Sequence, residues 1–146
     1  TVVPRQRRLR RSTVAMATDP YELTVALDAN GAAAGEVFLD DGVSFDFVRG
    51  GFARTAFSYA NGKLSAAPAH ECDARARALG VAADAATGAF APANVVERIV
   101  VLGLQASPKA VAVAGRAVDF SWTAGALTIR RPDLPMAGAW AVDFTF

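Results

Sequence analysis

The chain has 146 residues and a mass of 15.2 kDa, with 53% hydrophobic and 20% charged residues, which is enough for one domain with a buried core. Its net charge of +1 is unevenly distributed, because five arginines and no acid precede Asp19, and the rest carries ten basic and fourteen acidic side chains. This distribution excludes a uniformly basic nucleic-acid-binding protein, and no apolar run approaches the roughly 20 residues of a membrane-spanning helix.

Residues 1–18 are interpreted as a basic connector. Its arginines are Arg5, Arg7, Arg8, Arg10 and Arg11. A nuclear-localisation or phosphate-binding arm is the alternative, but no aromatic residues lie between the arginines and the remaining chain is acidic. We therefore expect the arginines to pair with acids of a neighbouring domain. The chain opens on Thr1 rather than methionine, so we also expect it to be processed or part of a longer polypeptide.

Period-two alternation of apolar residues predicts antiparallel strands in the first half of the chain. The predicted strands lie at 22–28, 37–39, 45–47, 56–59 and 63–64. Asp41-Gly42 and Asn61-Gly62 predict tight reversals, because glycine adopts a positive φ at low cost.

The second half repeats this pattern after an interruption. Residues 68–92 are rich in alanine and lack alternation, so they predict a long surface loop, with residues 74–86 able to form one or two helical turns. A nearly unbroken apolar run at 95–104 predicts either a strand buried on both sides or a central strand. Further strands are predicted at 111–113, 118–122, 127–129 and 140–146. Together these elements predict an all-β fold, an antiparallel β-sandwich of about eight or nine strands.

Asp40-Asp41 is the only adjacent pair of carboxylates, and paired carboxylates perform glycoside hydrolysis. Neighbouring strand residues point to opposite faces, so these two cannot flank one sugar bond. The favoured interpretation is a strand end followed by an Asp-Gly turn. A calcium site using Asp40, Asp41 and Asp46 is a weaker alternative.

His70-Glu71-Cys72-Asp73 places four potential metal ligands in a row, but consecutive side chains rarely converge on one ion. The chain has only one histidine and one cysteine, and no Gly-x-Ser-x-Gly motif supports a catalytic triad. The single Cys72 also excludes an intrachain disulfide. We therefore predict no catalytic, cofactor-binding or metal-binding residues and no cofactor in this chain.

Four aromatic residues could form a sugar-stacking platform: Tyr21, Tyr59, Trp122 and Trp140. Both tryptophans are in register with apolar neighbours on their strands. Core packing is therefore the expected role for them.

Three stretches of the sequence are distinctive in combination. The first runs from Pro4-Arg5 to Arg11-Ser12 and continues with Asp19-Pro20-Tyr21-Glu22-Leu23 and Val25-Ala26-Leu27-Asp28. The second is Gly35-Glu36-Val37-Phe38-Leu39-Asp40-Asp41-Gly42 with Phe45, and the third is Val96-Glu97-Arg98-Ile99-Val100-Val101-Leu102-Gly103. Together these stretches resemble family 31 glycoside hydrolases of the glucosidase II type. Residues 108–130 also fit this resemblance, whereas the segment 69–93 is longer and richer in alanine than the family pattern.

The resemblance implies a position within a larger enzyme. In that family a (β/α)8 barrel carries the catalytic aspartates, and a proximal and a distal β-sandwich follow it. Residues 1–18 then correspond to a connector from the upstream domain and residues 19–146 to the distal C-terminal β-sandwich. No stretch here matches the catalytic motifs, so the segment alone is expected to be inactive.

The resemblance further implies an α-glucosidase that removes terminal α-1,3-linked glucose from N-glycans in the endoplasmic-reticulum lumen. Its partners would be the upstream barrel, the proximal sandwich and a regulatory beta subunit, with no nucleic acid. The chain has no Asn-x-Ser/Thr sequon and no terminal retention signal. The alternative function is a freestanding carbohydrate-binding or protein-interaction β-sandwich module.

Overall fold

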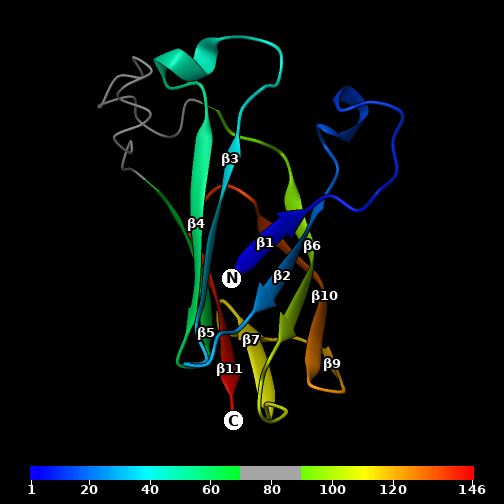
Figure 1. Ribbon diagram of the computed structural model, residues 1–146, viewed down its shortest axis with the longest axis vertical. Helices are drawn as coiled ribbons and strands as arrows, with labels where there is room; N and C mark the ends of the chain where they lie inside the picture. The colour runs from blue at the N-terminus through cyan, green and yellow to red at the C-terminus, as the bar shows by residue number, and fades with distance from the viewer. Residues whose placement is uncertain (70–89) are drawn as a thin grey trace.

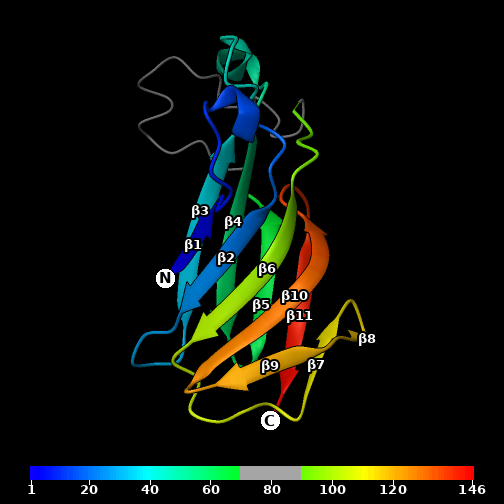
Figure 2. The same ribbon diagram turned by 90° about the vertical axis from the view of Figure 1, so that its right-hand side faces the viewer.

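The computed structural model describes residues 1–69 and 90–146, and these form a β-sandwich of two facing sheets (Figures 1 and 2). The strands are β1 (Val2–Arg5), β2 (Tyr21–Ala26), β3 (Ala33–Leu39), β4 (Ala53–Ala60), β5 (Lys63–Pro68), β6 (Val95–Leu102), β7 (Ala110–Val113), β8 (Arg116–Ala117), β9 (Phe120–Thr123), β10 (Ala126–Pro135) and β11 (Trp140–Thr145). The predicted all-β sandwich is confirmed, with eleven strands in the described residues rather than eight or nine.

One sheet has five strands in the order β1-β2-β6-β10-β9. The strand β6 lies at its centre, as the apolar run at 95–104 predicts. Every pairing in this sheet is antiparallel except that of β2 with β6, which is parallel. This parallel pair was not predicted, because it joins segments that are separated by more than half the chain.

The other sheet has six strands in the order β3-β4-β5-β11-β7-β8, and all its pairings are antiparallel. The predicted reversal at Asn61-Gly62 joins β4 to β5, with φ of 51° and 72° at the two residues. Two further hairpins also have both turn residues in the left-handed backbone conformation, with alanine in the first position, at Ala114-Gly115 and Ala124-Gly125. An alanine pays a steric cost in this conformation that glycine and asparagine largely avoid.

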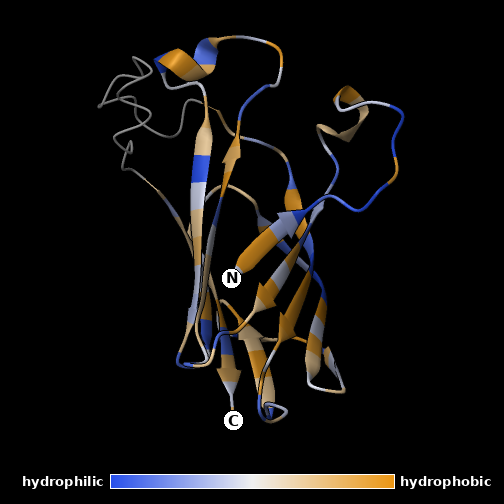
Figure 3. Cartoon of the chain, in the orientation of Figure 1, coloured by the Kyte–Doolittle hydropathy of each residue, from blue (hydrophilic) through white to orange (hydrophobic). Residues whose placement is uncertain are grey.

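The core lies between the sheets and is filled by the inward residues of each strand. Hydrophobic and hydrophilic residues alternate along the strands in Figure 3, which is the pattern from which the fold was predicted. The largest fully buried side chains are Phe57, Leu23, Leu64, Ile99, Leu127, Ile129, Met136, Val25, Val96, Val101, Val111 and Val142. Two aromatic pairs extend this core, Phe57 with Trp140 at 6.0 Å between ring centroids and Tyr59 with Phe144 at 5.5 Å.

The predicted strand at 45–47 is wrong. Residues 46–49 form a short 3-10 helix, η2 (Asp46–Arg49), inside a longer connection between β3 and β4. Local hydrogen bonds explain the difference: the Asp41 carboxylate accepts from the backbone N–H groups of Val43 and Ser44, and the Ser44 hydroxyl accepts from that of Asp46. Such side-chain bonds compete with strand formation.

The connector contains a strand that the sequence did not reveal. Residues 2–5 form β1, which pairs with β2 and buries Val2 in the core. The strand also crosses close to β3, where a Cβ added to Gly35 would overlap the carbonyl group of Val2. Between β1 and β2, residues 6–20 form the connector loop, which contains the 3-10 helix η1 (Val14–Met16).

Most of the predicted alanine-rich loop at 68–92 lies outside the described residues.

Candidate functional site

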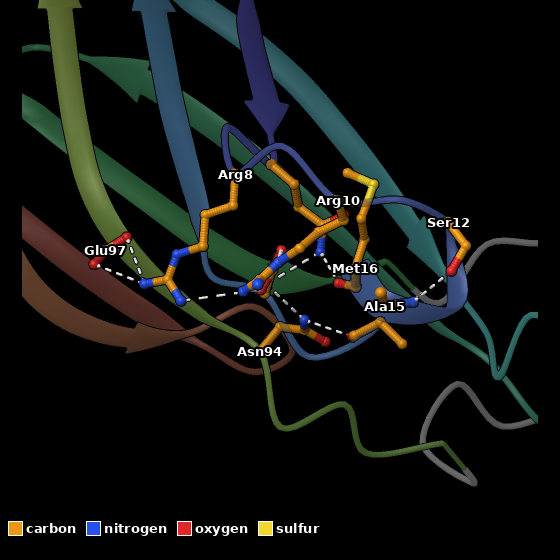
Figure 4. A network of polar contacts seen from close by, with 10 residues as sticks. Arg8, Arg10, Ser12, Ala15, Met16, Asn94 and Glu97 are labelled. Carbon is orange, nitrogen blue, oxygen red and sulfur yellow. Dashed lines mark hydrogen bonds and ion pairs between the residues drawn. The ribbon is translucent and has the colours of Figure 1, made fainter.

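A polar network around Asp19 fastens the connector loop to the sandwich. Figure 4 shows Arg8, Arg10 and Asn94 of this network. The Asp19 carboxylate, 4% exposed, accepts two hydrogen bonds from Arg10, from Nε at 2.8 Å and from Nη2 at 2.7 Å. Nη1 of Arg8 lies 3.9 Å from Oδ1 of the same carboxylate. The hydrogen bonds from Arg10 lower the pKa of Asp19 against the opposing effect of desolvation.

Glu22 makes a second junction, at the start of β2. Nη1 of Arg7 donates to both carboxylate oxygens at 3.1 Å, and Nη1 of Arg98 on β6 donates to one of them at 3.4 Å. The Glu22 side chain is 9% exposed, so its charge lies between two guanidinium groups. A carboxylate with little access to water needs such partners. These two ion pairs of Glu22 therefore link the connector loop to β2 and to β6.

Arg8 links Asp19 to β6. Its Nη2 donates to Glu97 of β6 at 3.2 and 3.4 Å, and both side chains are 48% exposed. Exposed pairs of this kind contribute little to stability. Arg8 therefore orients the loop over β6 rather than supplying much folding energy.

Two amide side chains hold the backbone of the connector loop. Nε2 of Gln6 donates to the carbonyls of Met16 and Asp19, at 2.8 and 3.1 Å. From the other side, Nδ2 of the buried Asn94 donates to the carbonyls of Ala17 and Asp19, both at 2.8 Å. The loop is thus fixed to the residues that precede β6, although it has almost no regular secondary structure.

These contacts correct one expectation from the sequence. Arg7, Arg8 and Arg10 pair with acids of the sandwich itself, not with those of a neighbouring domain. In the part of the chain that the structure describes, no ion pair is found for Arg5 or Arg11. Arg10 and Asp19 are 9 positions apart, Arg7 and Glu22 are 15 apart, and Arg8 and Glu97 are 89 apart. These separations follow no helical or strand period, so no local pattern indicates the partners.

The network borders an open hollow of about 370 Å³, lined by Arg8, Thr18, Pro20, Glu97, Arg131 and Asp133, among others. Arg131 and Asp133 have φ of 51° and belong to an irregularity in β10, where its register against β6 shifts. The charged groups of the lining are two arginines and two acids. None of the described lining residues is aromatic, so they offer no face on which a sugar ring could stack.

The weaker alternative of a calcium site at Asp40, Asp41 and Asp46 finds no support in the described residues. Asp40 and Asp41 bond to backbone N–H groups of their own loop, and Asp46 pairs with Arg49 at 2.5 Å. Hydrogen bonds from Ser44, and a further one from the backbone N–H of Val43, lower the pKa of Asp41. Among residues 1–69 and 90–146 no group of three metal-ligating side chains converges. The segment His70-Glu71-Cys72-Asp73 lies outside the described residues.

The four predicted aromatic residues do not form a platform. Tyr59 is buried, and Tyr21, Trp122 and Trp140 are half-buried against the core. The indole N–H of Trp140 donates to the carbonyl of Pro135 at 2.8 Å. Core packing, the expected role, is therefore what the structure has.

In the described ranges no helix is long and apolar enough to cross a membrane.

No family model matches the chain. Curated relatives do: the chain is 34% identical over 152 aligned residues to a probable glucan 1,3-alpha-glucosidase of Oryza sativa. It is 31% identical to the human neutral alpha-glucosidase AB. Both alignments cover 97% of this chain, but the chain spans only 15% and 14% of those relatives' lengths.

Solved structures have the same fold. A crystal structure of a glucosidase II alpha subunit superposes with a TM-score of 0.76, at 22% identity, over 98% of this chain and 16% of that one. A dextranase of Flavobacterium johnsoniae superposes with a TM-score of 0.61 at 13% identity, over the whole of this chain and 19% of that one. The sandwich therefore corresponds to one part of much longer proteins.

Proposed function

The chain is homologous over nearly its whole length to one segment of the family 31 α-glucosidases, and from this premise we propose that it is a non-catalytic domain at the C-terminal end of such an enzyme. The observation that carries the proposal is the alignment itself, which takes in 97% of this chain and about a seventh of each relative. The domain would stabilise a catalytic barrel located upstream.

We assign residues 1–18 to a connector from the upstream domain and residues 19–146 to the distal β-sandwich. The pairing of β1 with β2 means that connector and sandwich share a sheet. The ion pairs of Asp19, Glu22 and Glu97 add a second attachment. Together these contacts hold the connector against β2 and β6.

Catalysis in this proposal belongs to two carboxylates of the barrel, which retain the configuration of the released glucose. We expect this chain to contribute no catalytic, cofactor-binding or metal-binding side chain. In support, the paired carboxylates Asp40 and Asp41 are used in hydrogen bonds to their own loop.

The substrate is terminal α-1,3-linked glucose on N-glycans, and the compartment is the endoplasmic-reticulum lumen. The α-1,3 linkage is supported by the names of the rice and Arabidopsis thaliana relatives, probable glucan 1,3-alpha-glucosidases. A regulatory beta subunit is the proposed partner of the whole enzyme. In support, a crystal structure of the glucosidase II heterodimer, which includes the binding domain of the regulatory subunit, superposes with a TM-score of 0.70.

The test is an activity assay on the intact polypeptide that contains this chain and on residues 1–146 alone. We expect the intact polypeptide to release glucose from an α-1,3-linked disaccharide and the isolated chain to release none. Turnover by the isolated chain would contradict the non-catalytic role. An intact polypeptide without α-glucosidase activity would contradict the assignment of the enzyme.

A further inference from the structure

The connection between β3 and β4 exposes large apolar side chains. We call residues 40–52 the η2 loop. Within it Val43 is 78% exposed, Phe45 80% and Val48 38%, and Phe38 on the adjoining strand is 50% exposed. Single exposed apolar residues are common, but a group of them on one loop indicates a contact surface.

The η2 loop is held in one conformation by its own hydrogen bonds. Asp40 accepts from the backbone N–H of Gly42, Asp41 from those of Val43 and Ser44, and Gly51 N–H donates to the carbonyl of Asp46. The ion pair of Arg49 with Asp46 spans η2. A loop ordered in this way presents its apolar side chains without a further ordering cost on binding.

Aromatic packing supports the base of the loop. The rings of Phe38 and Phe52 stack with centroids 4.9 Å apart, and Phe52 is buried. Phe45 and Phe47 lie 6.1 Å apart within the loop. The buried ring anchors the loop, so the exposed Phe45 is not needed to fill the core.

The connector loop exposes apolar side chains at the same end of the sandwich. Leu9 is 99% exposed and Val14 74%. Figures 1 and 2 agree in placing the loop with η1 and the loop with η2 at one end, away from the end at which β6 terminates. Hydrogen bonds of Asp19 and Asn94 likewise hold this second loop against the sandwich.

We propose that the η2 loop and the connector loop form a docking surface for the preceding domain of the same polypeptide. This inference rests on the proposed function, since the chain spans about 15% of its relatives' length and leaves most of such an enzyme outside. The η2 loop carries three aspartates and one arginine, so the surface it meets is apolar and bordered by basic side chains.

The experiment uses the intact enzyme and a double variant, Val43→Ser with Phe45→Ser. Both side chains are largely exposed in the sandwich, so the variant keeps the core intact. We measure amide hydrogen exchange of the η2 loop and of the preceding domain by mass spectrometry. The matched control is Leu102→Ser, a residue 38% exposed at the far end of β6.

In the wild-type enzyme we expect slow exchange in the η2 loop, and in the double variant exchange at least about tenfold faster in this loop and in one segment of the preceding domain. The control should leave both unchanged. Equal exchange in wild type and double variant would overturn the docking surface. Retained α-glucosidase activity in that case would leave the proposed function standing, whereas absence of activity from the wild-type enzyme would refute the function itself.

Discussion

Gly35 lies where β3 passes closest to β1, so its replacement by alanine tests whether residues 2–5 belong to the sandwich. A Cβ at this position would overlap the carbonyl oxygen of Val2 and lie 2.9 Å from its carbonyl carbon and 3.0 Å from its Cβ. Two of these atoms are backbone, so no side-chain rotation relieves the clash. Either β3 is displaced, or β1 moves away and exposes Val2.

Both responses have a similar cost. Overpacking a tight contact costs typically about 1–3 kcal/mol. Exposing the buried side chain of Val2 costs about 1.5–3 kcal/mol. We therefore expect Gly35→Ala to lower the free energy of unfolding by about 2 kcal/mol, which corresponds to a fall of about 4–8 °C in melting temperature for a chain of this size.

The assay is urea denaturation followed by tryptophan fluorescence. Ala34→Ser is the matched control, because Ala34 is the exposed neighbour on the same strand and such substitutions change stability by less than about 0.5 kcal/mol. If Gly35→Ala were as stable as this control, β1 would not lie against β3, and residues 2–5 would have to be separated from the sandwich.

Three further predictions concern turns and the connector. Ala114→Asn and Ala124→Asn should each raise the free energy of unfolding by about 0.5–1 kcal/mol, measured by urea denaturation, because asparagine tolerates the left-handed conformation better than alanine; a loss of stability would contradict the turn geometry. The folded-state pKa of Asp19 is lowered, so its stabilising effect should be present above its unfolded pKa near 4 and be lost as the pH falls through the lower folded value. The stability difference between wild type and Asp19→Asn should then shrink on acidification, and a constant difference would count against the ion pair. Asn94→Ala should loosen the connector loop without touching its charges, seen as faster proteolysis between residues 6 and 20, and unchanged cleavage would contradict the role of its two hydrogen bonds.

The sequence predicted the fold where the pattern is local. Alternation at 22–28 and 56–59 identified β2 and β4, and Asn61-Gly62 identified the hairpin that follows β4, because these signals depend on neighbouring residues alone. The strand at 45–47 was predicted wrongly from the spacing of two phenylalanines. In the η2 loop these rings do not alternate across a sheet but extend from a 3-10 turn fixed by aspartate and serine side chains.

The candidate site was predictable only in part. The arginine-rich connector was recognised from composition, but not β1, because Arg5 and Pro4 obscure a strand of four residues. The partners Glu22 and Glu97 could not be identified either. Contact of the connector loop with Glu22 depends on the pairing of β1 with β2, and contact with Glu97 depends on the parallel pairing of β2 with β6. Tertiary contacts of this kind have no periodic signal in the sequence.

The central claim, that this sandwich stabilises an α-glucosidase without taking part in its chemistry, is tested most directly by one measurement. This is the initial turnover per folded molecule of the intact enzyme carrying Gly35→Ala, at a temperature well below its unfolding transition. The account predicts the turnover of the wild type, because Gly35 affects only the packing of β1 on β3. A loss of about tenfold or more, equivalent to at least about 1.4 kcal/mol of transition-state stabilisation, would contradict the account.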